Sequence, residues 1–154
     1  MEPRERVRRF LDKLPYRLEI LEFEEDTHTA ELAARAVEVE IGQIAKSLLF
    51  LIGGQPVLVV TCGDVKVSQS KLKQNLGLSG KVKLADGEIT EELTGFPPGG
   101  VCPFALKEQI TVVLDKSLLR YPHTYAAAGT PHSAVAVTVE QLLEITGGKI
   151  LEVS

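Results

Sequence analysis

Lys46-Ser-Leu-Leu-Phe-Leu-Ile-Gly-Gly-Gln-Pro-Val-Leu-Val-Val60 contains two apolar runs separated by a pair of glycines. Continuous apolar runs of this length are typical of strands that are buried on both faces. Glycines adopt the positive φ angles of tight turns without steric cost. The stretch therefore predicts a β-hairpin, with Lys46 at the mouth of its first strand.

On either side of this hairpin, short helical patterns alternate irregularly with strand patterns. Capping residues and apolar spacing predict helices over 3–14, 30–37, 69–76, 88–93 and 139–146, with a further turn over 41–45. Alternating or apolar runs predict strands over 16–23, 82–84, 110–114, 125–128, 134–137 and 150–153. Strands that come in hairpins with interspersed helices indicate an α+β fold: a mixed, largely antiparallel, curled and barrel-like sheet surrounded by helices.

The composition is that of a soluble globular chain, with 44% apolar and 25% charged residues. Its 154 residues predict a single domain over 1–154. We expect a cytoplasmic protein, because the N-terminus lacks the apolar core of a signal peptide and no apolar run could span a membrane. The two cysteines and three dispersed histidines show no metal-ligand spacing, and no nucleotide-binding motif is present, so we expect neither a metal nor a cofactor.

The net charge of −4 is unevenly distributed along the chain. Between Cys62 and Lys83 a single acid, Asp64, accompanies five lysines: Lys66, Lys71, Lys73, Lys81 and Lys83. A local basic surface on an acidic protein favours selective contact with a structured polyanion. A merely solvated lysine face is the alternative.

The segment 94–104 is rich in residues that restrict the backbone, with three glycines and three prolines. Pro97, Pro98 and Pro103 fix its path, and the amides of residues 99–102 are expected to be free to donate. The segment is either a stiff connection or a preorganised loop that holds a ligand or an oxyanion.

Single side chains offer two further candidates for chemistry. Cys102 with His132 could form a nucleophilic pair, although the sequence shows no third orienting group. The ammonium of a lysine beside a buried strand loses solvation free energy unless it reaches water or meets an anion. Lys46 is therefore either a solubilising charge at a strand end or an anion-binding group. Cys62 is interpreted as a core residue. Asp115 is interpreted as the cap of the turn that follows it.

Four segments resemble the YbaK/EbsC-like family, the free-standing relatives of the editing domain inserted in bacterial prolyl-tRNA synthetases. They are Thr29-Ala-Glu-Leu-Ala-Ala, Gly42-Gln-Ile-Ala-Lys-Ser-Leu-Leu-Phe, Leu93-Thr-Gly-Phe-Pro-Pro-Gly-Gly-Val-Cys-Pro-Phe and Ala127-Ala-Gly-Thr-Pro-His. The match runs in order from about Thr27 to Val153. It implies the family's mixed β-sheet fold and hydrolysis of mischarged aminoacyl-tRNA, typically tRNA for proline that carries alanine, cysteine or another small residue.

The resemblance also assigns residues to roles. Lys46 matches the family's functional lysine, and Gly99 to Pro103 match its G-x-x-x-P loop. We therefore expect a catalytic group of Lys46, Gly100, Val101 and Cys102, and substrate contacts from Thr29, Gly99, Pro103, Gly129 and His132. The acceptor end of aminoacyl-tRNA is the expected partner, and the five lysines are expected to contact its phosphates. The resemblance also suggests prolyl-tRNA synthetase as a partner.

The chain departs from the family pattern at two positions. Glu38 replaces the glycine that ends the preceding helix in many relatives. Cys102 replaces a serine or proline, which argues against a nucleophilic cysteine.

An aminoacyl ester is labile, so positioning and electrostatics can suffice for its hydrolysis by water. We expect loop amides to hold the ester carbonyl and Lys46 to anchor a terminal phosphate or polarise the ester. A pocket that admits a small wrong amino acid would exclude the larger correct one. The alternatives are a module that binds aminoacyl-tRNA or a synthetase without hydrolysis, and a small-molecule hydrolase with Cys102 as its nucleophile.

Overall fold

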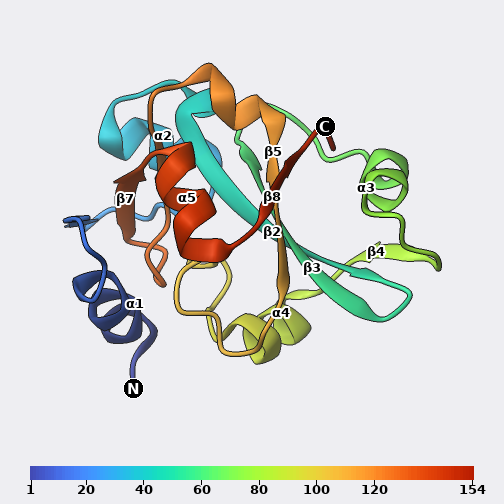
Figure 1. The fold of residues 1–154 in the computed structure, drawn as a ribbon. Helices are drawn as coiled ribbons and strands as arrows, with labels where there is room; N and C mark the ends of the chain where they lie inside the picture. Colours follow the sequence, from blue (N-terminus) through green and yellow to red (C-terminus); the bar gives the residue numbers. More distant parts are fainter.

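The computed structural model describes residues 1–154 and has a single eight-stranded sheet with five short helices around it (Figure 1). The strands are β1 (Ile20–Glu22), β2 (Ile44–Ile52), β3 (Gln55–Cys62), β4 (Val82–Leu84), β5 (Thr111–Asp115), β6 (Thr124–Ala126), β7 (Ser133–Val137) and β8 (Lys149–Leu151). The helices are α1 (Pro3–Asp12), α2 (Ala30–Val37), α3 (Gln69–Leu76), α4 (Gly87–Thr94) and α5 (Val139–Thr146). Two 3₁₀ turns, η1 (Ile41–Gln43) and η2 (Lys116–Arg120), complete the order.

The predicted hairpin is confirmed at the centre of the sheet. β2 and β3 pair antiparallel from Ala45 opposite Cys62 to Ile52 opposite Gln55. Gly53 and Gly54 turn the chain with φ values of 57° and 87°, which side chains other than glycine seldom adopt.

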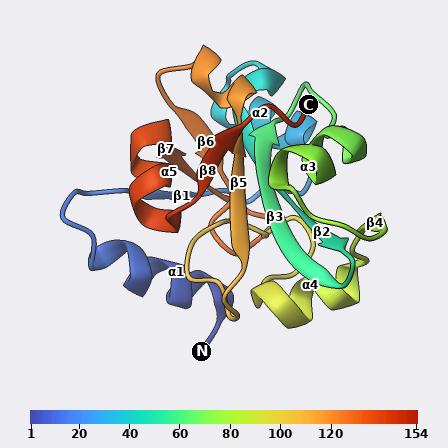
Figure 2. The same cartoon turned by 45° about the vertical axis from the view of Figure 1, so that its right-hand side comes forward.

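Alternate residues of β3 contribute to two separate hydrophobic cores. Leu58 and Val60 belong to the larger core, which also takes Leu142 from α5. Val57 and Val59 belong to the smaller core, together with Leu72 from α3. α5 and α3 accordingly lie on opposite sides of the sheet (Figures 1 and 2), and the hairpin is buried on both faces, as expected.

The sheet is mixed and open. The strand order is β1-β7-β6-β2-β3-β5-β8, with β4 attached to β2. Four pairings are antiparallel (β1–β7, β2–β3, β2–β4 and β6–β7) and three are parallel (β2–β6, β3–β5 and β5–β8). The α+β expectation is thus confirmed, but the curled sheet does not close into a barrel, because the edge strands β1 and β8 do not pair.

Helices that carry capping signals begin where the sequence predicts them. The side chains of Thr29, Ser68 and Thr138 each accept a backbone hydrogen bond at the start of α2, α3 and α5. Asp115 caps η2 by accepting from the amide of Ser117, as expected. No helix of the protein is long and apolar enough to cross a membrane.

Strand lengths were predicted less well. The strand expected over 16–23 is reduced to Ile20–Glu22, because β7 offers it only three partner residues. The strand expected over 125–128 is Thr124–Ala126, and the last strand is Lys149–Leu151 rather than 150–153. The first helix ends at Asp12, two residues before the predicted end.

Candidate functional site

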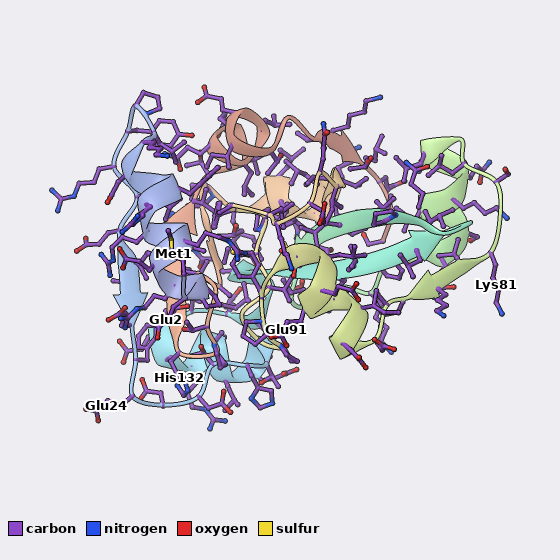
Figure 3. The ribbon with its side chains drawn as sticks, turned by 90° about the horizontal axis from the view of Figure 1, so that it is seen from below. Met1, Glu2, Glu24, Lys81, Glu91 and His132 are labelled. Carbon is purple, nitrogen blue, oxygen red and sulfur yellow. The ribbon has the colours of Figure 1, made fainter.

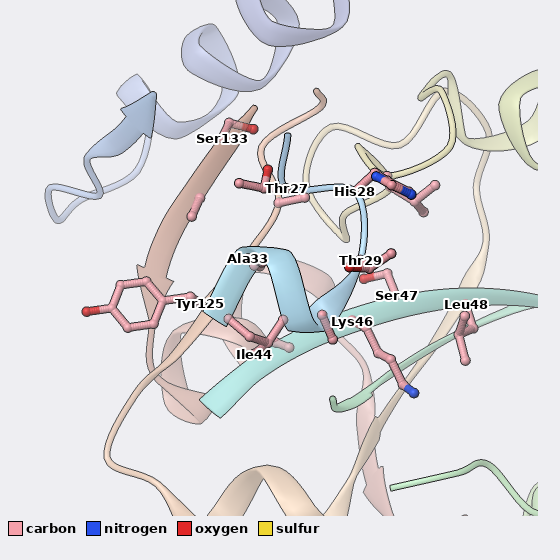
Figure 4. Close-up of a pocket in the computed structure, with 17 residues that line it drawn as sticks. Thr27, His28, Thr29, Ala33, Ile44, Lys46, Ser47, Leu48, Tyr125 and Ser133 are labelled. Atoms are coloured by element: carbon pink, nitrogen blue, oxygen red, sulfur yellow. The ribbon is translucent and has the colours of Figure 1, made fainter. Parts of the chain in front are cut away.

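A small cavity of about 230 Å³ lies between α2, the beginning of β2, the β6–β7 hairpin and the 94–104 loop (Figure 4). Most of its wall consists of small or aliphatic side chains: Ala30, Ala33, Ile44, Ala45, Leu48, Val101, Ala126, Ala127 and Ala134. The polar lining residues are Thr27, His28, Thr29, Lys46, Ser47, Tyr125 and Ser133, and Gly99 completes the wall. A cavity of this size and lining suits a small, mostly apolar group.

The cavity lies at a break in the pairing of β2. On one edge, β6 pairs with Ile44 and Ala45, and β4 pairs with Phe50 to Ile52. The residues between them, 46–49, have no strand partner on that edge, and Lys46, Ser47 and Leu48 line the cavity. The break therefore leaves room for a ligand beside the central strand.

Lys46 and Ser47 are neighbours whose side chains lie on opposite faces of β2, as the strand period of two requires (Figure 4). Ser47 lies on the same side as Thr29, whose hydroxyl accepts from the amide of Leu32 at 3.1 Å and so caps α2. Lys46 is half-buried and takes part in none of the protein's salt bridges or side-chain hydrogen bonds. Its ammonium is therefore available to an external anion.

The 94–104 loop brings Gly99 and Val101 to the cavity. Gly99 has a φ of 82°, and a Cβ there would lie 2.5 Å from the Cβ of His28, so the close contact requires glycine. A Cβ on Gly100 would lie 2.6 Å from the carbonyl of Gly129, so the loop packs directly on the β6–β7 turn. Each of these two glycines is needed for the loop to approach its neighbours.

The amides of this loop are not all free, which corrects the expectation for Gly100. The Gly100 amide donates to the carbonyl of Pro97 at 2.9 Å, and its own carbonyl accepts from Gly129 at 3.0 Å. The amides of Gly99 and Val101 donate to no acceptor within the protein, and both residues line the cavity. Gly99 and Val101 are therefore the loop donors that a bound ligand could use.

Arg6 of α1 fixes the start of the loop. Its guanidinium donates to the carbonyls of Thr94 at 2.9 Å and Ala105 at 3.0 Å, and it lies 4.4 Å from the centre of the Phe96 ring. Arg6 is thus a structural residue of the loop rather than a free cation.

Cys102 is fully buried and does not line the cavity. Burial raises the pKa of its thiol to about 12, so the sulfur is uncharged at neutral pH. The Sγ atom lies 3.9 Å from the carbonyl of Phe104. His132 is exposed on the β6–β7 turn, with Nδ1 3.0 Å from the carbonyl of Glu25. The structure gives no support to a Cys102–His132 nucleophilic pair.

Several other expected site residues lie outside the cavity. Pro103 is buried beside Cys102. Gly129 and His132 line a different hollow of about 500 Å³, beside the N-terminus of α1 and residues Arg4 and Glu22. Gly129 supports the site only indirectly, through its bond to Gly100.

The five lysines expected to contact tRNA lie on and around α3 and β4, away from the cavity wall. Four of them are exposed and Lys73 is half-buried. Lys71 donates to the carbonyl of Ser154 at 2.9 Å, and Lys81 lies at the opposite end of the molecule from His132 (Figure 3). They form a basic flank beside the smaller core.

Sequence reasoning missed several cavity residues, among them Thr27, His28, Ser47, Tyr125 and Ser133. Ser47 follows Lys46 directly, so strand alternation could have placed it on the opposite face. Thr27 and Ser47 carry buried hydroxyl oxygens that have no hydrogen-bond partner. Buried hydroxyls without partners are uncommon, and two of the four in this protein belong to residues of the cavity wall.

An open mixed sheet with a small cavity at a break in its central strand defines an α+β protein with a candidate site for a small ligand. Residues 24–145 match the model of the aminoacyl-tRNA editing domain, and the chain belongs to this family. No cluster of three or more His, Cys, Asp or Glu side chains that could hold a metal ion is found.

Individual relatives support the family assignment. The chain is 38% identical to the uncharacterized protein YwhH of Bacillus subtilis over 133 residues, which cover 86% of this chain and 83% of YwhH. It is 28% identical to EbsC of Enterococcus faecalis, a candidate Cys-tRNA(Pro)/Cys-tRNA(Cys) deacylase, over 92% of this chain and 87% of EbsC. A crystal structure of a candidate trans-editing enzyme for prolyl-tRNA synthetase superposes with a TM-score of 0.90 at 34% identity, covering 100% of this chain and 98% of that one.

Proposed function

We propose that this protein is a trans-editing hydrolase that removes a small wrong amino acid from mischarged aminoacyl-tRNA. The proposed substrate is tRNA for proline that carries a small noncognate residue. Membership of the editing family and the likeness to EbsC and to the trans-editing structure support the reaction class. The observation that carries the proposal is the cavity itself, a small and mostly apolar chamber whose wall includes Lys46, a lysine with no ion-pair partner.

The chemistry would need little from side chains. The free amides of Gly99 and Val101 are the donors we assign to the ester carbonyl and its developing oxyanion. One preorganised donor of this kind stabilises a transition state by about 3 kcal/mol. The ammonium of Lys46 would bind the terminal phosphate or polarise the ester, and water would attack the carbonyl carbon.

Selectivity would follow from the size of the chamber. Alanines make up much of the wall, and the cavity of about 230 Å³ would admit a short side chain more readily than a long one. Such a chamber acts as a second sieve, because it hydrolyses only what is small enough to enter.

The cysteine-hydrolase alternative is disfavoured, since the Cys102 thiol is buried, uncharged and outside the cavity. The remaining alternative is a module that binds aminoacyl-tRNA without hydrolysing it. Only a measurement of deacylation distinguishes that module from the proposed hydrolase.

Deacylation of a panel of mischarged tRNAs tests the proposal. We expect release of small amino acids from tRNA for proline, with correctly charged prolyl-tRNA left intact. Lys46→Ala serves as the control for the assigned site. Tight binding of these tRNAs without any hydrolysis would instead establish the binding module.

A further inference from the structure

A bidentate ion pair between Arg120 and Asp64 lies close to the start of β2. Arg120, at the end of η2, donates from Nη1 and Nη2 to the two carboxylate oxygens of Asp64, at 3.1 and 2.5 Å. Its Nε donates to the carbonyl of Ser117 at 3.1 Å, and its guanidinium lies 5.3 Å from the centre of the Tyr121 ring. The arginine is therefore fixed in one orientation, with both of its terminal nitrogens on a single acid.

The opposite side of the Asp64 carboxylate is enclosed by the backbone of η1. A Cβ on Gly42 would lie 2.8 Å from Oδ2 of Asp64 and 2.4 Å from the hydroxyl of Tyr121. The carboxylate thus lies between Gly42, Tyr121 and Arg120, and Arg120 holds both of its oxygens.

Lys46 lies in the electrostatic field of this carboxylate. It stands opposite Thr61 in the β2–β3 register, so both side chains project from the same face, and Asp64 follows Thr61 by three residues. The pKa of Asp64 lies below its ordinary value, chiefly because of Arg120 and to a smaller degree because of Lys46. No salt bridge nevertheless joins Lys46 to Asp64.

We propose that Arg120 is a positioning residue, which occupies Asp64 so that the ammonium of Lys46 stays free for the substrate. Without Arg120, the flexible stem of Lys46 would allow it to pair with Asp64, and the site would lose its cation. The inference rests on the proposed function of Lys46. An ion pair as exposed as this one contributes little to the free energy of unfolding. Loss of Arg120 should therefore change the kinetics of the site more than the stability of the fold.

Three variants test the inference: Arg120→Gln, Asp64→Asn and the double variant. We expect Arg120→Gln to raise KM about tenfold with a smaller change in kcat, because the competing carboxylate is released toward Lys46. Asp64→Asn alone should remain within about twofold of the wild type, since it removes the competitor. The double variant should recover most of the lost activity. Arg9→Gln, which breaks the ion pair between Arg9 and Glu5 on α1, is the matched control.

A double variant as impaired as Arg120→Gln would overturn the inference, because Arg120 would then act directly on substrate or on folding. Unchanged kinetics of Arg120→Gln would overturn it as well. The rate at which Lys46 reacts with a lysine-acylating reagent provides a readout that needs no enzymatic activity. That rate should fall in Arg120→Gln and recover in the double variant. If the wild type hydrolyses no ester, the proposed function fails, while the labelling rates still decide the role of Arg120.

Discussion

Lys46 lines the cavity and is bound by no other side chain of the protein. Its ammonium has no partner within the protein, and its side chain is only half-buried. The neighbouring Ser47 projects from the other face of β2, toward α2. Two successive residues thus place an ammonium on one face of β2 and a hydroxyl on the other, at the segment where β2 lacks a strand partner on one edge.

Replacing Lys46 by Ala should lower kcat/KM for deacylation at least about 100-fold, because an electrostatic contact made in the transition state is lost. The free energy of unfolding should change by no more than about 0.5 kcal/mol, as for other partly exposed side chains. Single-turnover deacylation and thermal denaturation measure the two quantities. Lys149→Ala, at an exposed lysine of β8 outside the basic flank, is the matched control. Equal losses of activity and stability in Lys46→Ala would show a structural lysine.

Replacing Cys102 by Ser should leave activity within about threefold of the wild type, because the thiol is buried and does not line the cavity. The new hydroxyl should lower the free energy of unfolding by about 1 kcal/mol or more, since it is placed in an apolar environment. Loss of activity at unchanged stability, with a trapped thioester on the wild type, would instead establish a nucleophilic cysteine.

At the scale of elements, α2 ends in an unusual way. Glu38 adopts a φ of 60° at the C-cap, the left-handed conformation that glycine adopts most easily. The family resemblance places a glycine at this residue in many relatives, and the helix ends there with an intact cap bond from the amide of Glu38 to the carbonyl of Ala34.

Glu38→Gly should therefore raise the free energy of unfolding by about 0.5 kcal/mol. Relief of left-handed strain contributes about 1 kcal/mol, and the greater freedom of glycine in the unfolded chain offsets about half of it. Glu38→Ala keeps the Cβ and should show no gain. Chemical denaturation of both variants decides whether the strain is real.

Asp115 joins three elements at the end of β5. Its carboxylate accepts hydrogen bonds from Thr61 of β3 at 3.3 Å, from the amide of Ser117 at 3.1 Å and from the amide of Val153 at 2.9 Å. Burial acts to raise the pKa of Asp115, but hydrogen bonds from Ser117 and from the amide of Val153 outweigh it and hold the pKa below the ordinary value.

A lowered pKa makes the contribution of Asp115 to stability dependent on pH. That contribution should be fully present above the unfolded pKa of about 3.9 and should be lost as pH falls toward the lower folded value. Asp115→Asn should cost about 2 kcal/mol at neutral pH and flatten the acid limb of the stability curve. Urea denaturation between neutral and acid pH measures both effects. An unchanged acid limb would contradict the assignment.

Elements defined by local signals could be predicted from the sequence, and those defined by distant partners could not. Thr29, Ser68 and Thr138 mark helix starts because a cap bond spans only three residues. β1 is shorter than its pattern suggests, since its length depends on β7. The cavity follows the same rule. Lys46 and Gly99 could be assigned to it by family resemblance, whereas Thr27 and Ser133 reach it only through the pairing of the β6–β7 hairpin with β2.

At the scale of the molecule, the proposed tRNA substrate would meet a basic surface outside the chamber. The net charge is −4, yet the basic flank at α3 and β4 faces solvent. A minimal aminoacyl-adenosine would fill only the chamber. An acceptor stem would extend over the surrounding surface, where phosphate contacts become available.

Reversing Lys81 and Lys83 to Glu should weaken tRNA binding and lower its salt slope by about one unit for each lysine, because phosphate contacts are lost. Hydrolysis of a minimal aminoacyl-adenosine should stay within about twofold of the wild type, since the chamber is unaltered. Reversing Lys13 and Lys149 gives the same net charge from outside the flank and is the control. Equal losses of tRNA affinity in both double variants would show that the flank is only a solvated surface.

The order of the strands also has a consequence for synthesis on the ribosome. β1 lies at one edge of the sheet, where Ile20 pairs with Val135, and β8 closes the other edge beside β5. The first strand to emerge therefore has no partner until β7 has been synthesised. The β2–β3 hairpin, by contrast, can form as soon as its own residues leave the exit tunnel. Until β7 and β8 have emerged, the nascent protein has a paired central hairpin and two unpaired edges, and chaperones that cover exposed strands would act at those edges.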